Sequence, residues 1–135
     1  MRIGGPCLIA IAVAAILPFS RQGEAAAICG VRFESPGQIE LFLKRQRGLK
    51  RTINADQYYG YAEKGGLKFW LFTKPGNPAH PSVSCRRAVQ IDGSWRMHAN
   101  IMCRQGKRKC GAIAAQFKQL DRQMKKDIED RVGRQ

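Results

Sequence analysis

The chain has 135 residues, among them 24 lysines and arginines but only 10 aspartates and glutamates, so its net charge is +14 at neutral pH. This length favours one domain and excludes a chain of several large domains. The charge indicates attraction to polyanions, namely lipopolysaccharide, anionic lipid headgroups, acidic glycans or nucleic acid, although the sequence contains no specific nucleic-acid motif.

The first 27 residues have the pattern of an export signal. A basic start at Arg2 precedes the uncharged stretch 7–19, and the small residues 25–27 follow as a signal-peptidase site. The apolar stretch is shorter than the ~18 residues expected of a membrane-spanning helix, which argues against an uncleaved anchor. We therefore predict a signal peptide over residues 1–27 and a single small exported domain over 28–135. This domain would be periplasmic or secreted, with no transmembrane helix after cleavage, and it keeps 22 basic and 9 acidic side chains.

Four cysteines lie in the predicted exported domain: Cys29, Cys85, Cys103 and Cys110. An even number in a small exported chain predicts two disulfides, because such a domain buries little core and is often crosslinked. A zinc site is the weaker alternative, since no pair has CxxC spacing. We expect Cys29 to pair with Cys85 and Cys103 with Cys110. The alternative, Cys85 with Cys110 and Cys29 with Cys103, stays open.

Residues 28–48 predict a short strand followed by a helix. The stretch 28–34 alternates loosely between apolar and polar residues. Ser35 is then a candidate N-cap, Pro36 takes the first helical position, and Gln38 completes a capping-box spacing. Gly48 can end this helix. Three apolar side chains would share one face of it: Ile39, Phe42 and Leu43.

Residues 58–73 predict a β-hairpin with a tight turn at the two glycines 65–66. If Lys64 pairs with Leu67, then Glu63 faces Lys68 as a cross-strand ion pair. An exposed aromatic face on this hairpin would form a platform on which sugar rings, bases or a protein partner could stack; the alternative is that the aromatic residues form the core. The platform would consist of Tyr59, Tyr61, Trp70 and Phe72.

A second hairpin is predicted over residues 82–103, and its register depends on the turn. A tight turn at residues 92–93 is one option. We prefer a three-residue loop that pairs Gln90 with Ser94, because it gathers more apolar residues on one face. Arg87 then lies unexplained on that apolar face. The opposite face would carry a cationic patch suited to an anion, beside Asn100: Arg86, Arg96 and His98.

From Gly106 onward, apolar residues recur every three or four positions, which predicts an amphipathic helix that packs on the sheet. Six cations at its start and along it form a second predicted anion-binding set: Lys107, Arg108, Lys109, Lys118, Arg122 and Lys125. The predicted fold class is therefore α+β: a short strand, a helix, a four-stranded antiparallel sheet made of two hairpins, and a C-terminal amphipathic helix, stapled by two disulfides.

The proline-rich stretch 73–87 raises the question of catalysis. Its three prolines suit a surface connector between strands, and Ser82 lacks the Gly-x-Ser-x-Gly motif. Cys85 is expected to be oxidised, and His80 has no acidic residue close in sequence to orient it. We therefore predict no catalytic residue in this stretch. The sequence also predicts no metal site and no cofactor.

These features together predict a non-enzymatic, exported, basic binding or accessory protein that engages an anionic envelope surface or an acidic protein partner. Two alternatives stay open. One is a small secreted hydrolase that uses His80 or His98, and the other is an inhibitor-like protein that presents the proline-rich stretch to its target.

Overall fold

The computed structural model describes residues 27–134 and has the predicted α+β class. Its elements are β1 (Ala27–Ile28), β2 (Val31–Arg32), α1 (Pro36–Arg45), β3 (Ile53–Asn54), β4 (Tyr58–Ala62), β5 (Lys68–Thr73), β6 (Ser82–Ile91), β7 (Ser94–Cys103) and α2 (Lys107–Val132). Strands β3 to β7 form one antiparallel sheet in sequence order, while β1 and β2 pair separately. The main sheet has five strands rather than four, because the two-residue strand β3 adds to its edge. The predicted signal peptide lies outside the described residues, except that Ala27 begins β1.

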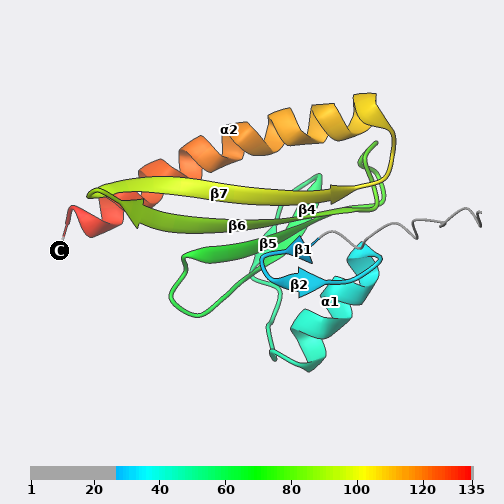
Figure 1. Cartoon of the computed structure of the whole chain (residues 1–135), viewed down its shortest axis with the longest axis horizontal. Helices are drawn as coiled ribbons and strands as arrows, with labels where there is room; N and C mark the ends of the chain where they lie inside the picture. The colour runs from blue at the N-terminus through cyan, green and yellow to red at the C-terminus, as the bar shows by residue number, and fades with distance from the viewer. Residues whose placement is uncertain (1–26, 135) are drawn as a thin grey trace, which may run out of the picture.

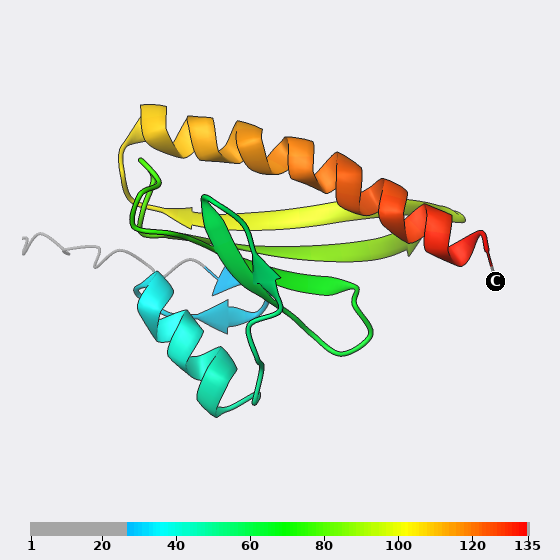
Figure 2. The ribbon, with the colours of Figure 1, turned by 180° about the vertical axis from the view of Figure 1, so that it is seen from behind.

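The two helices cover opposite faces of the five-stranded sheet (Figures 1 and 2). On one face, α1 and the β1–β2 hairpin enclose a core that contains Ile39 and Trp70. On the other face, α2 packs Ile113 and Phe117 against Leu71. Within residues 27–134, no helix combines the length and the apolar character needed to cross a membrane. The sheet is thus the middle layer of three, with a separate core on each side.

Helix α1 begins where the capping pattern predicts. The Ser35 hydroxyl accepts a hydrogen bond from the Gln38 backbone N–H at 3.3 Å, and Gln38 Oε1 accepts one from the Glu34 N–H at 2.9 Å. Gly48 follows the helix with a φ of +61°, a conformation that glycine adopts without strain. These local interactions set both ends of α1, whose Leu43 is completely buried against the sheet.

Residues 28–34, predicted as one strand, instead contain a tight hairpin. Ile28 pairs with Val31, and the intervening Cys29 and Gly30 have φ values of +48° and +78°. Two central residues with positive φ are typical of a type I′ turn. A cysteine seldom takes this conformation, so no residue in the stretch signals the turn. The hairpin places Cys29 at its tip.

The hairpin of β4 and β5 has the predicted register. Tyr61 lies opposite Trp70, and the Glu63 carboxylate is 3.2 Å from Lys68 Nζ. The aromatic residues share one face, but α1 and the β1–β2 hairpin cover it, so that Tyr61 and Trp70 are fully buried and Phe72 is 2% exposed. The predicted exposed platform is therefore wrong, and the core alternative holds for its members: Tyr59, Tyr61, Trp70 and Phe72.

The hairpin of β6 and β7 uses the tight turn at residues 92–93, with φ values of +50° and +77°. Gln90 lies opposite Trp95, so the preferred three-residue loop was wrong by one residue. Such a slip places every side chain of β7 on the opposite face relative to β6. The error arose because both faces of β6 are buried: Val83 belongs to the core under α1, while Arg86 lies under α2.

Both predicted disulfides are present. Cys29 joins Cys85 with a Cα–Cα distance of 6.1 Å, and Cys103 joins Cys110 at 5.7 Å. The pairing was predicted correctly despite the wrong register, because Cys85 lies opposite Asn100 and Cys103 is further along β7 on the other face. The first disulfide closes the α1 side of the sheet, and the second fixes the first turn of α2 to the end of β7.

Candidate anion-binding surface

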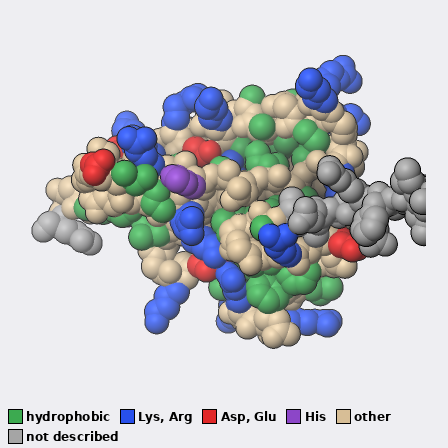
Figure 3. All heavy atoms as spheres, in the orientation of Figure 1, with side chains coloured by type: hydrophobic (Ala, Val, Ile, Leu, Met, Phe, Trp, Pro, Cys, Tyr) green, Lys and Arg blue, Asp and Glu red, His purple; other side chains and the backbone are tan. Residues whose placement is uncertain are grey.

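Helix α2 carries a series of cations that the fold largely leaves without counter-charges. They are named here the α2 cations: Lys107, Arg108, Lys109, Lys118, Arg122 and Lys125. All except Lys125 are exposed, and Figure 3 shows basic side chains along the outer side of α2. Within residues 27–134, only Lys125 has a carboxylate within ion-pair distance, Glu129 at 3.6 Å. The other five are therefore open to an external anion.

The first turn of α2 has a charge distribution that opposes helix stability. Gly106 occupies the N-cap position and offers no side chain to the free backbone N–H groups, and the first turn contains no acidic residue. Residues 107–109 instead place three cations at the positive end of the helix dipole, each of which costs about 0.3–1 kcal/mol. Helix stability alone therefore does not explain these charges.

Arg86, predicted to belong to a sheet-face patch, lies beneath α2 instead. Its side chain is fully buried, its Nε donates to Asp121, and its Nη1 donates to Ser84 Oγ at 2.5 Å. The guanidinium carbon is 4.2 Å from the ring centre of Phe117. Burial lowers the pKa of Arg86, while the Asp121 carboxylate opposes that shift. Arg86 is thus a structural residue, and its assignment to an anion site was wrong because the register slip reversed its face.

Arg96 and His98 do share an outer face of the sheet. Their neighbours on that face are Arg87 and Lys68, rather than Arg86. Lys68 lies opposite Arg87, and Arg87 lies opposite His98, so three adjacent strands bring these side chains into one row. Like charges placed opposite each other in a sheet are destabilising. The sequence prediction did not include Arg87 and Lys68 in this patch. The tight turn at residues 92–93 was the signal for Arg87, because that turn sets Arg87 opposite His98.

A carboxylate on α1 holds that helix to the neighbouring strands. Glu40 accepts hydrogen bonds from the hydroxyls of Tyr59 at 2.9 Å and Tyr61 at 2.6 Å, and it lies 3.2 Å from Lys44 Nζ. Burial acts to raise the pKa of Glu40, but the bonds from Tyr61, Tyr59 and Lys44 outweigh it and hold that pKa below its usual value. Burial, together with the bond to Glu40, raises the pKa of Tyr59 to about 12.

A second carboxylate, Glu63, has the same role at the other end of α1. It accepts from Arg47 Nη1 at 2.5 Å and from Trp70 Nε1 at 2.8 Å, and it also pairs with Lys68. Burial acts to raise the pKa of Glu63, but the hydrogen bonds from Trp70 and Lys68 lower it by more. Lys44 and Arg47 are therefore engaged by carboxylates of the fold, unlike most of the α2 cations.

The three prolines of the proline-rich stretch lie in the connector between β5 and β6, residues 74–81, as predicted, and the rest of the stretch belongs to the two strands. Its His80 Nδ1 lies 2.9 Å from the Thr73 carbonyl, and because a carbonyl only accepts, Nδ1 carries the proton. Within residues 27–134, no carboxylate lies within 4.0 Å of a nitrogen of His80 or His98. In the described part of the chain, the hydrolase hypothesis thus has no orienting carboxylate next to either histidine.

Comparisons with known proteins leave the family of this chain open. No protein-family model, no curated protein and no solved structure matches it. In the part of the chain that the structure describes, no group of three or more His, Cys, Asp and Glu side chains is placed to hold a metal ion. The function is therefore inferred from the geometry of the surface.

Proposed function

We propose that this protein is an exported, non-enzymatic binding domain whose α2 cations engage an anionic envelope surface. The observation that carries the proposal is the set of five exposed α2 cations without a carboxylate partner in residues 27–134, three of them in an uncapped first turn. The excess of 22 basic over 9 acidic side chains in the predicted exported domain supports long-range attraction to such a surface. The two disulfides are compatible with an oxidising compartment. An acidic protein partner is the alternative for the same cations.

A charge-reversal experiment tests this proposal. One variant carries Lys107→Glu, Arg108→Glu and Lys109→Glu, and the control reverses three exposed cations elsewhere, Arg32, Lys50 and Lys64. Both variants have the same net charge, so they differ only in where the charge is lost. The α2 variant should release phosphatidylglycerol vesicles at lower salt than the control, because local potential governs contact with a charged surface.

The α2 variant also contains its own folding control. Acidic residues in a first turn are favoured by the helix dipole, so this variant should be at least as stable to urea as the parent protein. Equal salt midpoints for the two variants would contradict the proposal. If neither the parent nor the control binds vesicles, but both capture an acidic protein from native envelope at low salt, the acidic-partner alternative gains support.

A further inference from the structure

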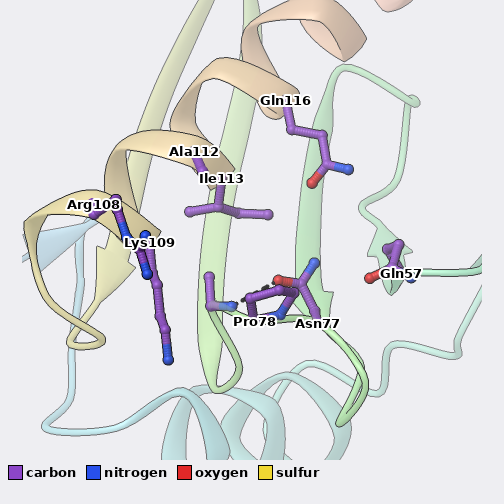
Figure 4. A pocket seen from close by; sticks show the side chains of 9 residues that line it. Gln57, Asn77, Pro78, Arg108, Lys109, Ala112, Ile113 and Gln116 are labelled. Atoms are coloured by element: carbon purple, nitrogen blue, oxygen red, sulfur yellow. Dashed lines mark hydrogen bonds between the residues drawn. The ribbon is translucent and has the colours of Figure 1, made fainter.

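A pocket of about 580 Å³ lies between the connector of β5 and β6 and the first turns of α2 (Figure 4). Its volume falls within the ~300–1,000 Å³ that is usual for small-molecule sites. Ala79 and Ile113, both 2% exposed, contribute apolar surface to it. Arg108 and Lys109 line it on one side, and Gln57 lines it on the opposite side.

The side chain of Asn77 presents an unused hydrogen-bond donor to this pocket. Asn77 is only 6% exposed, and its Oδ1 accepts from the Ala79 backbone N–H at 2.9 Å. That bond fixes the amide orientation, because a flipped amide would set two donors against each other. Within residues 27–134, Nδ2 donates to no acceptor, and Figure 4 shows it directed toward α2. Because Nδ2 has no acceptor among these residues, it is available to a ligand oxygen that enters the pocket.

The wall that carries Asn77 is already ordered without a ligand. The Asn77 N–H donates to the Lys74 carbonyl and the His80 N–H donates to the Asn77 carbonyl, both at 2.9 Å. The Ser82 hydroxyl donates to the Ala79 carbonyl. These bonds make the connector a sequence of closed turns, so ligand binding would not have to order it.

The opposing wall supplies charge and is fixed covalently. Arg108 and Lys109 lie in the first turn of α2, next to Cys110, whose disulfide to Cys103 holds this turn at the end of β7. Neither cation has a carboxylate within 4.0 Å in the described residues. The pocket thus combines two cations and one unused amide donor with an apolar floor. This combination is complementary to an organic anion rather than to an inorganic ion or a neutral lipid.

We propose that the pocket binds a small organic carboxylate with an apolar body. The carboxylate accepts from Asn77 Nδ2 and pairs with Arg108 and Lys109, and the apolar body lies against Ala79 and Ile113. This site goes beyond the proposed envelope surface and does not rest on it. The two sites share Arg108 and Lys109, but a polyanion lies along the outside of α2, whereas this ligand enters between α2 and the connector.

Octanoate is the probe, and octylammonium, with the same chain and the opposite charge, is its control. Calorimetry at physiological salt should give one saturable site for octanoate and none for octylammonium. In ¹⁵N spectra, octanoate should shift the side-chain amide of Asn77 and the backbone amides of Ile113 and Gln116. Asn77→Asp retains the acceptor for Ala79 but removes the donor, and it should weaken octanoate binding by about tenfold or more.

A matched pair of double variants tests the charge. Arg108→Gln with Lys109→Gln should weaken octanoate binding by about tenfold, whereas Lys118→Gln with Arg122→Gln, which changes net charge equally, should leave it within about twofold. Absence of saturable octanoate binding, equal affinity in the two double variants, or equal binding of octylammonium would each overturn the assignment. Because the second double variant removes outward α2 cations, loss of vesicle binding there with intact octanoate binding would separate the two proposals.

Discussion

Arg86 of β6 and Asp121 of α2 form an ion pair beneath α2, although 35 residues separate them in the chain. The Arg86 side chain is completely buried, and that of Asp121 is 18% exposed. A buried guanidinium without its counter-charge is strongly unfavourable, because the protein interior solvates the charge poorly. The pair therefore fixes where along the sheet α2 can settle.

Removing only the acidic partner should destabilise the fold. Asp121→Ala leaves Arg86 buried and unpaired, and we expect the free energy of unfolding in urea to fall by about 3 kcal/mol or more. The double variant Arg86→Met with Asp121→Leu removes both charges and should recover most of this loss. A loss well below about 1 kcal/mol for Asp121→Ala would mean that the pair does not hold α2 in place.

Stability at high pH should depend on Tyr59. Its folded-state pKa of about 12 lies above the ordinary value of 10.0, so the folded protein retains this proton over a range where the unfolded chain loses it. The corresponding stability is complete below pH ~10 and is lost as pH rises toward ~12. Between pH ~9.5 and ~11.5, the urea midpoint of the parent should fall more steeply than that of Tyr59→Phe, which keeps the ring stacked on Phe72. Parallel pH profiles for the two proteins would argue against the shift.

Two glycine substitutions should have opposite effects. A Cβ at Gly60 in β4 would lie 2.3 Å from the Trp70 carbonyl oxygen and 2.8 Å from Leu71 Cδ2, so Gly60→Ala should lose about 2 kcal/mol or more. Gly111 lies within α2, and a Cβ there would meet nothing within 4 Å. Gly111→Ala should stabilise the protein by up to about 1 kcal/mol, because alanine favours the helix. The thermal unfolding midpoints of both variants, compared with that of the parent, test these two expectations. A Gly60→Ala variant as stable as the parent would contradict the close packing at Gly60.

The two disulfides should contribute unequally to stability. Cys29 and Cys85 are separated by 56 positions, and Cys103 and Cys110 by 7. In the loop-entropy description, crosslinking the longer loop stabilises by about 4 kcal/mol and crosslinking the shorter by about 2.5 kcal/mol. Alanine pairs at each disulfide, compared by urea unfolding, should show this order. The reverse order would mean that native packing around α2, rather than chain entropy, determines the effect.

The parts of the fold that could be read from the sequence are those fixed by short-range interactions. Ser35 and Gln38 cap α1 through bonds between near neighbours, and the register of β4 and β5 follows from a glycine turn with the Glu63–Lys68 pair beside it. Each of these signals lies within a few residues of the structure it determines. For that reason the sequence carried them without knowledge of the rest of the fold.

The register of β6 and β7 could not be read in the same way. Periodicity identifies a strand's buried face only when the other face is in water, and both faces of the first half of β6 are buried, under α1 on one side and under α2 on the other. The pocket was equally hidden, since Asn77 and Arg108 are brought together by the packing of α2 on the connector. Local sequence also gives no means of knowing that the aromatic face around Trp70 is covered.

The sheet separates two cores, and each core has its own helix and its own crosslink. Detachment of α2 would wet the side around Leu71 while Trp70 on the reverse side stayed enclosed by α1. The side of the sheet under α2 should therefore open separately from the side under α1. Amide protons of α2 would exchange with solvent through a partial opening, ahead of those in β5 and β6, which both halves share.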